Sequence, residues 1–471
     1  MNNRNKKQKL KQLNQLKKEK SKELNKNFYI YMSINDIDYF VGTLCVHSKL
    51  PKYEYSTFEY DKEWLNNKYA FPLGYDLPLQ PCIFNSLETC NLKKDKSMFF
   101  SISFLTVVDK VDFYYEYLLI YAMKNGLIQK GEHVDLNYLY EWFKQATVTS
   151  PKFATNYATD TSLSLLNNFP LLNDYTRTGS IRYKTDKNGD FISVFDKNLL
   201  PKIDEIDDII DIIEKVENNT ENLSELKRLH VCVSSLDGRQ PKSSVTDDDG
   251  NLYIAKLSAV KDKDTFFNKE LLALILAKKY GIRVEEYSIH KTKDNKQFFL
   301  IKRFDREQSK RIPVMRMNVI IPLHKWDREK ILVQGIKNLC KENYITNVQE
   351  FYKRLLFRVA IGDKPAFIPN TCFLFDIETG WNISPDYDVT IGYSTITGGH
   401  SMPRKIVRKR LALKQVLKKA KYFKINKAHL RYLLKHLQIA LKNWKTDALN
   451  VGFNEEELQN IRIFKEAFIG L

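Results

Sequence analysis

Four polar side chains near two short apolar segments have the chemistry to hold a metal ion. Three are the carboxylates of Asp363, Asp386 and Asp388, and the fourth is the amide of Asn370. The segment from 358 to 389 reads as two short apolar strands, each running into a polar turn. Oxygens held at strand ends are the hard ligands that Mg²⁺ and its phosphates require. A surface β-hairpin with solvated acids is the alternative interpretation.

A small polar loop and a lysine on a nearby strand could bind the phosphates of a nucleotide. The loop at 234–238 follows an apolar strand at 231–233, and a hairpin turn at 247–251 leads to a strand at 252–257. Exposed N–H groups of a Ser/Gly-rich turn form an anion nest, and Lys256 inside the second strand can reach the same phosphates. The loop has one glycine and is no Walker motif, so an ordinary hairpin is the alternative.

Glu270 falls near the start of a helix predicted over 264–280. An acid there could pair with Lys256, as a strand lysine and a helix glutamate do in protein kinases. Its alternative role is simple favourable placement at a helix N-terminus. Residues 297–306 read as a strand ending where a nucleotide-binding hinge is expected. The order of these parts is that of a bilobal kinase, although the H-R-D and D-F-G motifs are absent.

The remaining elements must position these groups. Residues 28–44 alternate and break at Asn35 and Asp36, which predicts a hairpin, and 176–183 reads as another strand. Helices are predicted over most of 100–170, over an acidic connector at 203–228, and at 327–341 and 347–361.

Composition limits the class of protein. At 471 residues the chain is too long for one compact core, which predicts two or three domains. A hydrophobic fraction of 43% with 13% aromatics excludes overall disorder.

The six cysteines are scattered without a C-x-x-C pair, which argues against zinc and disulfides and suits a reducing cytoplasm. No apolar run reaches about 18 residues, so no membrane span is expected, and the basic N-terminus lacks the apolar region of a secretory signal.

The net charge of +18 favours contact with a polyanion. DNA, RNA, an acidic partner protein and the Lys and Asn usage of an AT-rich genome all fit this balance. From Arg404 to Lys445 the chain has fifteen Lys and Arg residues and no acid, in amphipathic helices with either a solvated basic face or a polyanion-binding one. Residues 1–27 read as a frayed basic helix or disordered arm, with a nucleic-acid-contacting tail as the alternative.

Several motifs in sequence together resemble the HipA family of bacterial toxin serine/threonine kinases. Residues 28–44, 58–65 and 71–79 look like the family's N-terminal β-rich domain, and 176–183 is similar to its R-Q-G-A-L-R-F strand. Residues 234–242 resemble the S-S-x-G-G-A-R-P-K phosphate loop. The motifs that follow in family order are Y-I-A-K at 253–256, K-E at 269–270, R-F-D-R at 303–306, I-G at 361–362 with Asn370, and S-P-D-Y-D at 384–388.

The resemblance implies a kinase that uses ATP and Mg²⁺, phosphorylates a protein serine and is inhibited by a small helix-turn-helix antitoxin. Known members of the family act on aminoacyl-tRNA synthetases. By position, Lys256 would contact the ATP phosphates, and Asn370 and Asp388 would hold Mg²⁺. Ser234, Ser235 and Gly238 would form the phosphate loop, with Ser235 as the regulatory autophosphorylation site. Glu270 would pair with Lys256, and Lys302 to Phe304 would lie at the adenine.

The chain departs from the family at its catalytic segment, which usually reads I-G-N-x-D-x-H-x-K-N. Residues 361–370 here read I-G-D-K-P-A-F-I-P-N, so Pro365 replaces the catalytic Asp, Phe367 the His and Pro369 the Lys. Proline cannot accept the proton of a substrate hydroxyl. Asp363 is a candidate substitute base, although two positions along a strand would place it some 6–7 Å away. Asp237 also replaces a loop glycine and would repel phosphate unless it turns away.

We therefore predict an α+β, bilobal kinase-like fold with a β-rich N-terminal subdomain and a mostly helical C-terminal lobe. Function is predicted as weak or absent phosphoryl transfer by a nucleotide-binding kinase fold. The alternative is a non-catalytic nucleic-acid-binding or assembly protein. The predicted divisions are a basic arm (1–27), a HipA N-terminal-like domain with a helical insertion (28–200), an acidic connector (201–228), a nucleotide-binding part (229–310) and a helical lobe with metal-binding loops and basic helices (311–471).

Overall fold

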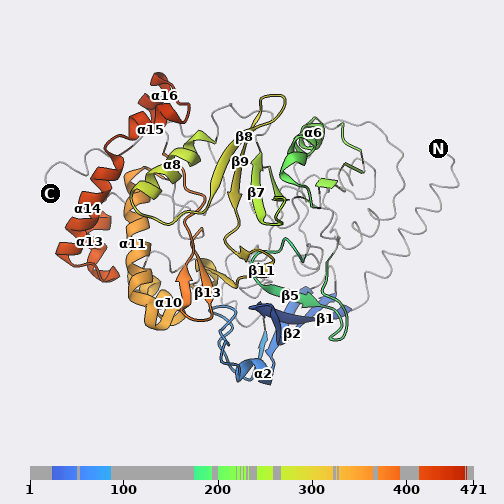
Figure 1. Cartoon of the computed structure of the whole chain (residues 1–471). Helices are drawn as coiled ribbons and strands as arrows, with labels where there is room; N and C mark the ends of the chain where they lie inside the picture. Colours follow the sequence, from blue (N-terminus) through green and yellow to red (C-terminus); the bar gives the residue numbers. More distant parts are fainter. Residues whose placement is uncertain are drawn as a thin grey trace. The chain divides into compact units, whose positions relative to one another are not determined.

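A computed structural model describes 24–49, 53–85, 174–193, 200–218, 220–222, 224–225, 228–229, 232, 241–257, 267–321, 325, 328–363, 370–392, 413–461 and 463 (Figure 1). The chain divides into two compact units, residues 1–200 with 211–239 and residues 201–210 with 240–471. The finer five-part division stays a prediction. The helical prediction over 100–170, the phosphate loop with Ser234, Ser235 and Gly238, and Pro365 lie outside the described residues. In the described part, no helix is both long and apolar enough to cross a membrane.

The first unit contains a five-stranded sheet in the order β4-β3-β2-β1-β5. Asn35 and Asp36 both adopt positive φ angles, 49° and 62°, between β1 and β2. Two such residues close a tight hairpin, because the turn's twist then matches that of the strands, and the predicted hairpin is confirmed. The predicted strand at 176–183 begins only at Ile181. The bounds are β1 Leu24–Ile34, β2 Ile37–Lys49, β3 Tyr53–Tyr60, β4 Ile83–Asn85 and β5 Ile181–Lys184, with a short helix α2 at Lys62–Leu65.

The second unit contains an antiparallel sheet in the order β6-β7-β9-β8. β7 is found at the predicted bounds, and 247–251 is its hairpin turn. The predicted strand at 231–233 is wrong at Cys232, which is helical and whose thiol donates to the carbonyl of Arg228. β6, which pairs with β7, lies further on. The bounds are β6 Lys242–Thr246, β7 Leu252–Leu257, β8 Tyr287–Lys291, β9 Gln297–Lys302, η4 Ile203–Glu205 and α8 Asn268–Lys279. The helix α6 Ile206–Glu217 belongs to the second unit up to Ile210 and to the first unit beyond it.

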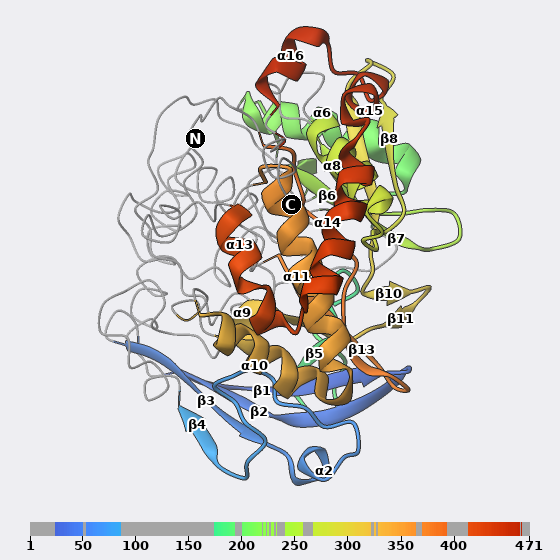
Figure 2. The ribbon, with the colours of Figure 1, turned by 90° about the vertical axis from the view of Figure 1, so that its left-hand side faces the viewer.

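Helices make up most of the remainder of this unit. α11 packs on α13 and η7, since the Tyr352 hydroxyl donates to the carbonyl of Val416 and the rings of Phe351 and Phe423 stack (Figure 2). The helices are α9 Met317–Ile320, α10 Glu329–Cys340, η6 Lys341–Asn343, α11 Tyr344–Ala360, α13 Leu413–Lys419, η7 Ala420–Phe423, α14 Lys427–Leu441, α15 Trp444–Asn450 and α16 Glu455–Asn460. The short strands are β10 Arg306–Glu307, β11 Lys310–Arg311, β12 Val314–Arg316, β13 Cys372–Asp376 and β14 Gly380–Ile383.

The segment that the sequence singled out is built from a helix end and a hairpin. The two predicted short strands are β13 and β14, which pair with each other. The sequence predicts Asp363 near a strand, but the residue follows a turn at the end of α11. The helix continues to Ala360, and Gly362 then reverses the chain with a φ of 68°. The N–H of Gly392 donates to the carbonyl of Ile361, so two distant segments meet backbone to backbone at this turn.

Candidate functional site

A buried ion pair joins the sheet to the first turn of α8. The Lys256 ammonium lies 2.7 and 2.8 Å from the two carboxylate oxygens of Glu270. The side chains are only 10% and 8% exposed. Lys256 emerges from the interior of β7, and Glu270 lies near the start of the helix that follows. The predicted pairing of strand lysine and helix glutamate is therefore present in the structure.

The same lysine also contacts the predicted metal-binding residues. Its Nζ lies 3.2 Å from Oδ1 of Asp388, and Nδ2 of Asn370 donates to Oδ2 of Asp388 at 2.7 Å. Four residues predicted separately from the sequence thus form one connected chain, Glu270–Lys256–Asp388–Asn370. We call this chain the polar relay.

The neighbouring charges shift the pKa values of the polar relay. The Lys256 ammonium lowers the pKa of Asp388 to about 2, whereas burial raises the pKa of Glu270 against the opposing effect of Lys256. Burial alone would lower the pKa of Lys256, but the carboxylates of Glu270 and Asp388 outweigh it and raise that pKa. Lys242, which lies opposite Lys256 in the β6–β7 register, adds positive charge and further lowers the pKa of Asp388. The cluster therefore combines two ammonium groups, Lys256 and Lys242, with two carboxylates, Glu270 and Asp388.

Asp388 is placed for contact with a ligand. Its side chain is 54% exposed, in contrast to the buried Lys256–Glu270 pair. Its backbone adopts a φ of 53°, in the left-handed region that residues other than glycine rarely occupy. Such conformations concentrate at functional sites, where the surrounding structure over-determines them.

The donor set of the polar relay fits Mg²⁺. Among the residues that the structure describes, no three His, Cys, Asp or Glu side chains gather into a metal cage. Mg²⁺ is commonly held by one or two carboxylates together with substrate phosphates rather than by a closed protein cage. The carboxylate of Asp388 and the amide oxygen of Asn370 supply that kind of partial coordination, beside an ammonium that suits phosphate.

The predicted adenine-contacting residues lie on the next strand and the turn after it. Lys302 ends β9 opposite Tyr253, three positions along β7 from Lys256. The ring of Phe304 lies 5.3 Å from that of Tyr387, the residue before Asp388. The structure therefore brings Phe304 next to the loop that carries Asp388, whereas Lys302 lies further along the sheet.

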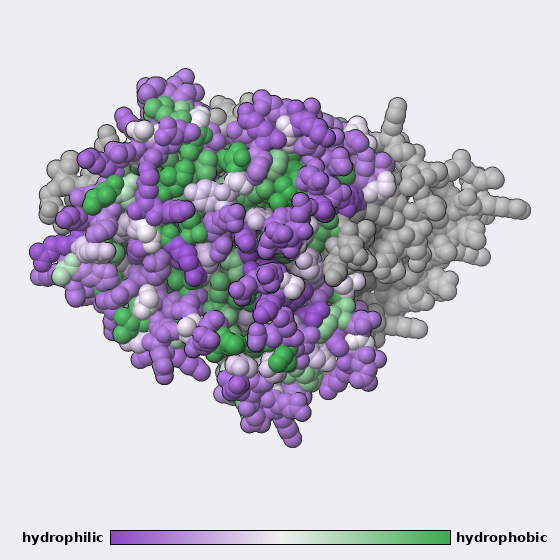
Figure 3. Space-filling model, viewed as in Figure 1, coloured by the Kyte–Doolittle hydropathy of each residue, from purple (hydrophilic) through white to green (hydrophobic). Residues whose placement is uncertain are grey.

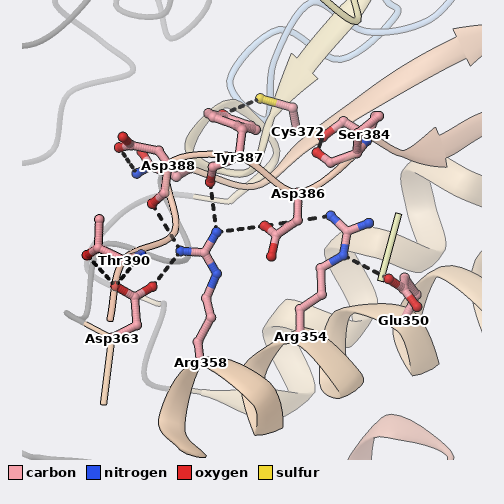
Figure 4. Close-up of polar contacts among 12 residues, drawn as sticks. Glu350, Arg354, Arg358, Asp363, Cys372, Ser384, Asp386, Tyr387, Asp388 and Thr390 are labelled. Carbon is pink, nitrogen blue, oxygen red and sulfur yellow. Dashed lines mark hydrogen bonds and ion pairs between the residues drawn. The ribbon is translucent and has the colours of Figure 1, made fainter. Parts of the chain in front are cut away.

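The sequence interpretation missed an ionic network behind Asp388. Arg358 near the end of α11 contacts both Asp363 and Asp386, and Arg354 one turn earlier bonds to Glu350 (Figure 4). The available signal was two arginines four residues apart on an otherwise amphipathic helix. Arginine at that spacing ordinarily indicates a solvated face, so nothing in the pattern marked these side chains as buried.

Comparisons with known proteins bear on the fold of the chain. Residues 234–444 match the family model of the HipA-like C-terminal domain. The chain is similar to one from the Shewanella oneidensis MR-1 toxin–antitoxin complex of HipA, HipB and operator DNA, at 14% identity and a TM-score of 0.51, over 92% of this chain and 93% of that one. No curated protein matches. At this identity the likeness shows the fold, which is α+β and kinase-like.

A second solved structure aligns more weakly. This is the Helicobacter pylori proinflammatory kinase CtkA, at 13% identity and a TM-score of 0.27, over 46% of this chain and 94% of that one. A TM-score at that level supports no inference about this chain.

Proposed function

This chain is a HipA-like protein, and on that premise we propose that it binds ATP with Mg²⁺ and phosphorylates a protein serine weakly or not at all. The polar relay carries the proposal, because it joins a phosphate-contacting lysine to two oxygen ligands. Charge neutralisation of the phosphates is the chemistry that Mg²⁺ supplies when bound. Asn370 and Asp388 would hold the ion, and Lys256, oriented by Glu270, would contact the phosphates.

Other predicted residues complete this proposal. Ser234, Ser235 and Gly238 would cradle phosphate with backbone N–H groups, and Phe304 with Lys302 would border the adenine. The proposed biological setting is a toxin–antitoxin pair in the cytoplasm. There a small helix-turn-helix antitoxin would inhibit the chain, and the substrate class would resemble an aminoacyl-tRNA synthetase.

Nucleotide binding is tested by thermal unfolding. Saturating ATP with Mg²⁺ should raise the melting temperature of the wild type by several degrees, because a ligand at about 100 times its Kd stabilises the folded state by roughly 2.7 kcal/mol. Lys256→Ala and Asp388→Ala should abolish the shift. Lys330→Ala, at an exposed position of α10, is the matched control and should keep it. An unshifted wild type would remove the nucleotide-binding claim.

Weak transfer follows from the proline at position 365. Loss of a positioned general base costs typically about 10²–10⁴-fold in rate. Pro365→Asp should therefore increase phosphate incorporation at Ser235, measured by mass spectrometry after incubation with ATP and Mg²⁺, whereas the wild type should show little. Strong labelling of the wild type that disappears in Asp363→Ala would contradict the proposal and make Asp363 the base.

A second candidate function, binding of DNA or RNA, is favoured by one specific observation. Four cations on and directly after α14 are exposed, at Lys427, Arg431, Lys435 and Lys442, and no acid lies between Arg404 and Lys445. The exposed rings of Tyr432 and His436 lie with their centroids 3.9 Å apart, tilted at 36°. Figure 3 shows a mainly hydrophilic surface in the region of α14. We call these four cations and the ring pair the α14 strip.

A further inference from the structure

We infer that Arg358 is a positioning residue that holds Asp388 in its left-handed conformation for metal binding. The inference rests on the proposed function and extends it to a residue outside the polar relay. Arg358 is not among the residues proposed to contact ATP or Mg²⁺. It acts through the two peptide units that flank the Cα of Asp388.

The contacts of Arg358 converge on one short loop. Its NH1 donates to Oδ2 of Asp363 at 2.7 Å and to the carbonyl of Asp388 at 3.3 Å. Its NH2 donates to Oδ1 of Asp386 at 2.6 Å and to the carbonyl of Tyr387 at 2.8 Å (Figure 4). A planar guanidinium presents several donors in a fixed geometry, so one side chain fixes four acceptors at once. We call Arg358 with these acceptors the Arg358 clamp.

The clamp has a conformational cost to offset. Asp388 has a φ of 53°, in the left-handed region, which Asp and Asn enter at a smaller cost than most residues but still less readily than the right-handed region. Hydrogen bonds to the carbonyls of Tyr387 and Asp388 fix the peptide units on both sides of the Asp388 Cα. The loop is therefore set before any metal arrives, and the ordering free energy need not come from the ligand.

Asp363 fixes the loop at its other end. Its Oδ1 accepts from the N–H of Thr390 at 3.3 Å and from the Thr390 hydroxyl at 3.1 Å, while its Oδ2 is held by Arg358. Both oxygens of this carboxylate are thus engaged, on the two sides of Asp388. This geometry favours a positioning role for Asp363 over the substitute-base role.

The network is buried and charged. The side chains of Arg358, Asp363 and Asp386 are 3%, 4% and 2% exposed. Burial would lower the pKa of Arg358, but the carboxylates of Asp386 and Asp363 raise it above its ordinary value, so the guanidinium stays charged. Removal of the arginine alone would take the Arg358 charge away from two buried carboxylates, of which Asp386 would keep only the cation contact with Arg354 at 4.0 Å, and this loss is strongly destabilising. A test must separate that effect from the positioning effect.

The test uses the full chain with four variants and two readouts. Arg358→Gln removes the clamp, and Arg358→Lys keeps the positive charge but lacks the planar set of N–H donors of the guanidinium. Arg358→Gln with Asp363→Asn and Asp386→Asn also removes the orphaned carboxylates. The matched control is Arg177→Gln in the first unit, where the arginine is fully buried and pairs with Asp174 at 3.5 Å. The readouts are hydrogen–deuterium exchange of 384–392 without ligand, and the Mg²⁺ concentration giving half-maximal binding at saturating ATP.

Arg358→Gln should increase exchange of 384–392 at least tenfold and raise the Mg²⁺ midpoint at least tenfold, with metal-free ATP binding unchanged. Arg358→Lys should give exchange rates and a Mg²⁺ midpoint between those of Arg358→Gln and the wild type. The triple variant should keep the raised exchange and the raised Mg²⁺ midpoint. Arg177→Gln, which leaves Asp386 and Asp363 with their Arg358 contacts, should resemble the wild type. Wild-type exchange in Arg358→Gln, or recovery in the triple variant, would overturn the inference. A wild type that binds no ATP–Mg²⁺ would defeat the proposed function, while the exchange readout would still decide the role of Arg358.

Discussion

Asp388 combines a charge that the polar relay stabilises with a backbone conformation that the Arg358 clamp stabilises. Asp388→Ala removes both together, because alanine tolerates the left-handed region poorly. Asp388→Asn removes the charge alone, since asparagine enters this region more readily than most residues. The two substitutions therefore report different properties of one position.

The depressed pKa of Asp388 gives a pH dependence of stability with a definite sign. The folded value of about 2 lies below the unfolded value of roughly 3.9, so the contribution is present above pH 4 and is lost as pH falls through 2. Asp388→Asn should reduce the free energy of unfolding at pH 7, measured with urea, and the difference from the wild type should shrink toward pH 2. A pH-independent difference would show that the Asp388 charge makes no such contribution.

At the scale of elements, α11 and α14 use basic residues in opposite ways. The arginines of α11 are buried against carboxylates and organise a loop, whereas the cations of the α14 strip are exposed. Only the second arrangement leaves charge accessible to a polyanion. The helix period alone does not distinguish them, because both helices are amphipathic.

Salt dependence tests the α14 strip. If it contacts nucleic acid, the logarithm of the binding constant of the full chain should fall linearly with the logarithm of salt concentration, with about 0.9 of slope per neutralised phosphate. Arg431→Ala, Lys435→Ala and Lys442→Ala should each reduce that slope by about one. Lys330→Ala on α10 serves as the exposed control and should leave it unchanged. Indifference of the full chain to DNA and RNA at low salt would exclude this function.

At the scale of the whole molecule, the second unit is discontinuous in sequence. Residues 201–210 belong with 240–471, and the N–H of Thr246 in β6 donates to the carbonyl of Pro201 at 3.0 Å. Ile206, Ile209 and Ile210 are fully buried or nearly so. The family match begins only at 234 and so excludes this segment.

A truncation series tests this assignment. A fragment of 200–471 should melt higher than one of 220–471, by on the order of 10 °C, because each buried isoleucine contributes roughly 1.5–3 kcal/mol. A fragment of 240–471 should resemble the 220–471 fragment if the stabilisation comes from 201–210. Circular dichroism melts measure the difference. Equal melting temperatures of the 200–471 and 220–471 fragments would contradict the assignment.

The residue types and their order in the sequence predicted the members of the polar relay, but they did not predict the Arg358 clamp that lies behind it. Lys256, Glu270, Asn370 and Asp388 each lie in or near a recognisable strand or helix, so their meeting could be inferred from the order of parts. Arg358 could not, because burial of an arginine depends on which carboxylates the tertiary fold places opposite it. Asp363 was predicted near a strand although the helix predicted over 347–361 ends within one residue of the end of α11, because the turn at Gly362 was not recognised.

Local sequence patterns also failed to give the correct bounds of two predicted strands, at 231–233 and at 176–183. Cys232 lies in an apolar triplet too short for periodicity to separate strand from helix. Residues 176–180 precede β5 with no apolar alternation to mark where pairing starts. The hairpin at Asn35 and Asp36 was predictable because these residue types tolerate the positive φ angles that its turn requires.

The meeting of the Gly362 turn with Gly392 has a genetic consequence. A Cβ at Gly392 would collide with the carbonyl oxygen of Gly362, so even alanine forces two backbone segments apart. Neither glycine carries a side chain of the polar relay or of the Arg358 clamp. Gly392→Ala is therefore a rational heat-sensitive allele, one that switches the protein off by temperature in a living cell while its chemical groups stay intact.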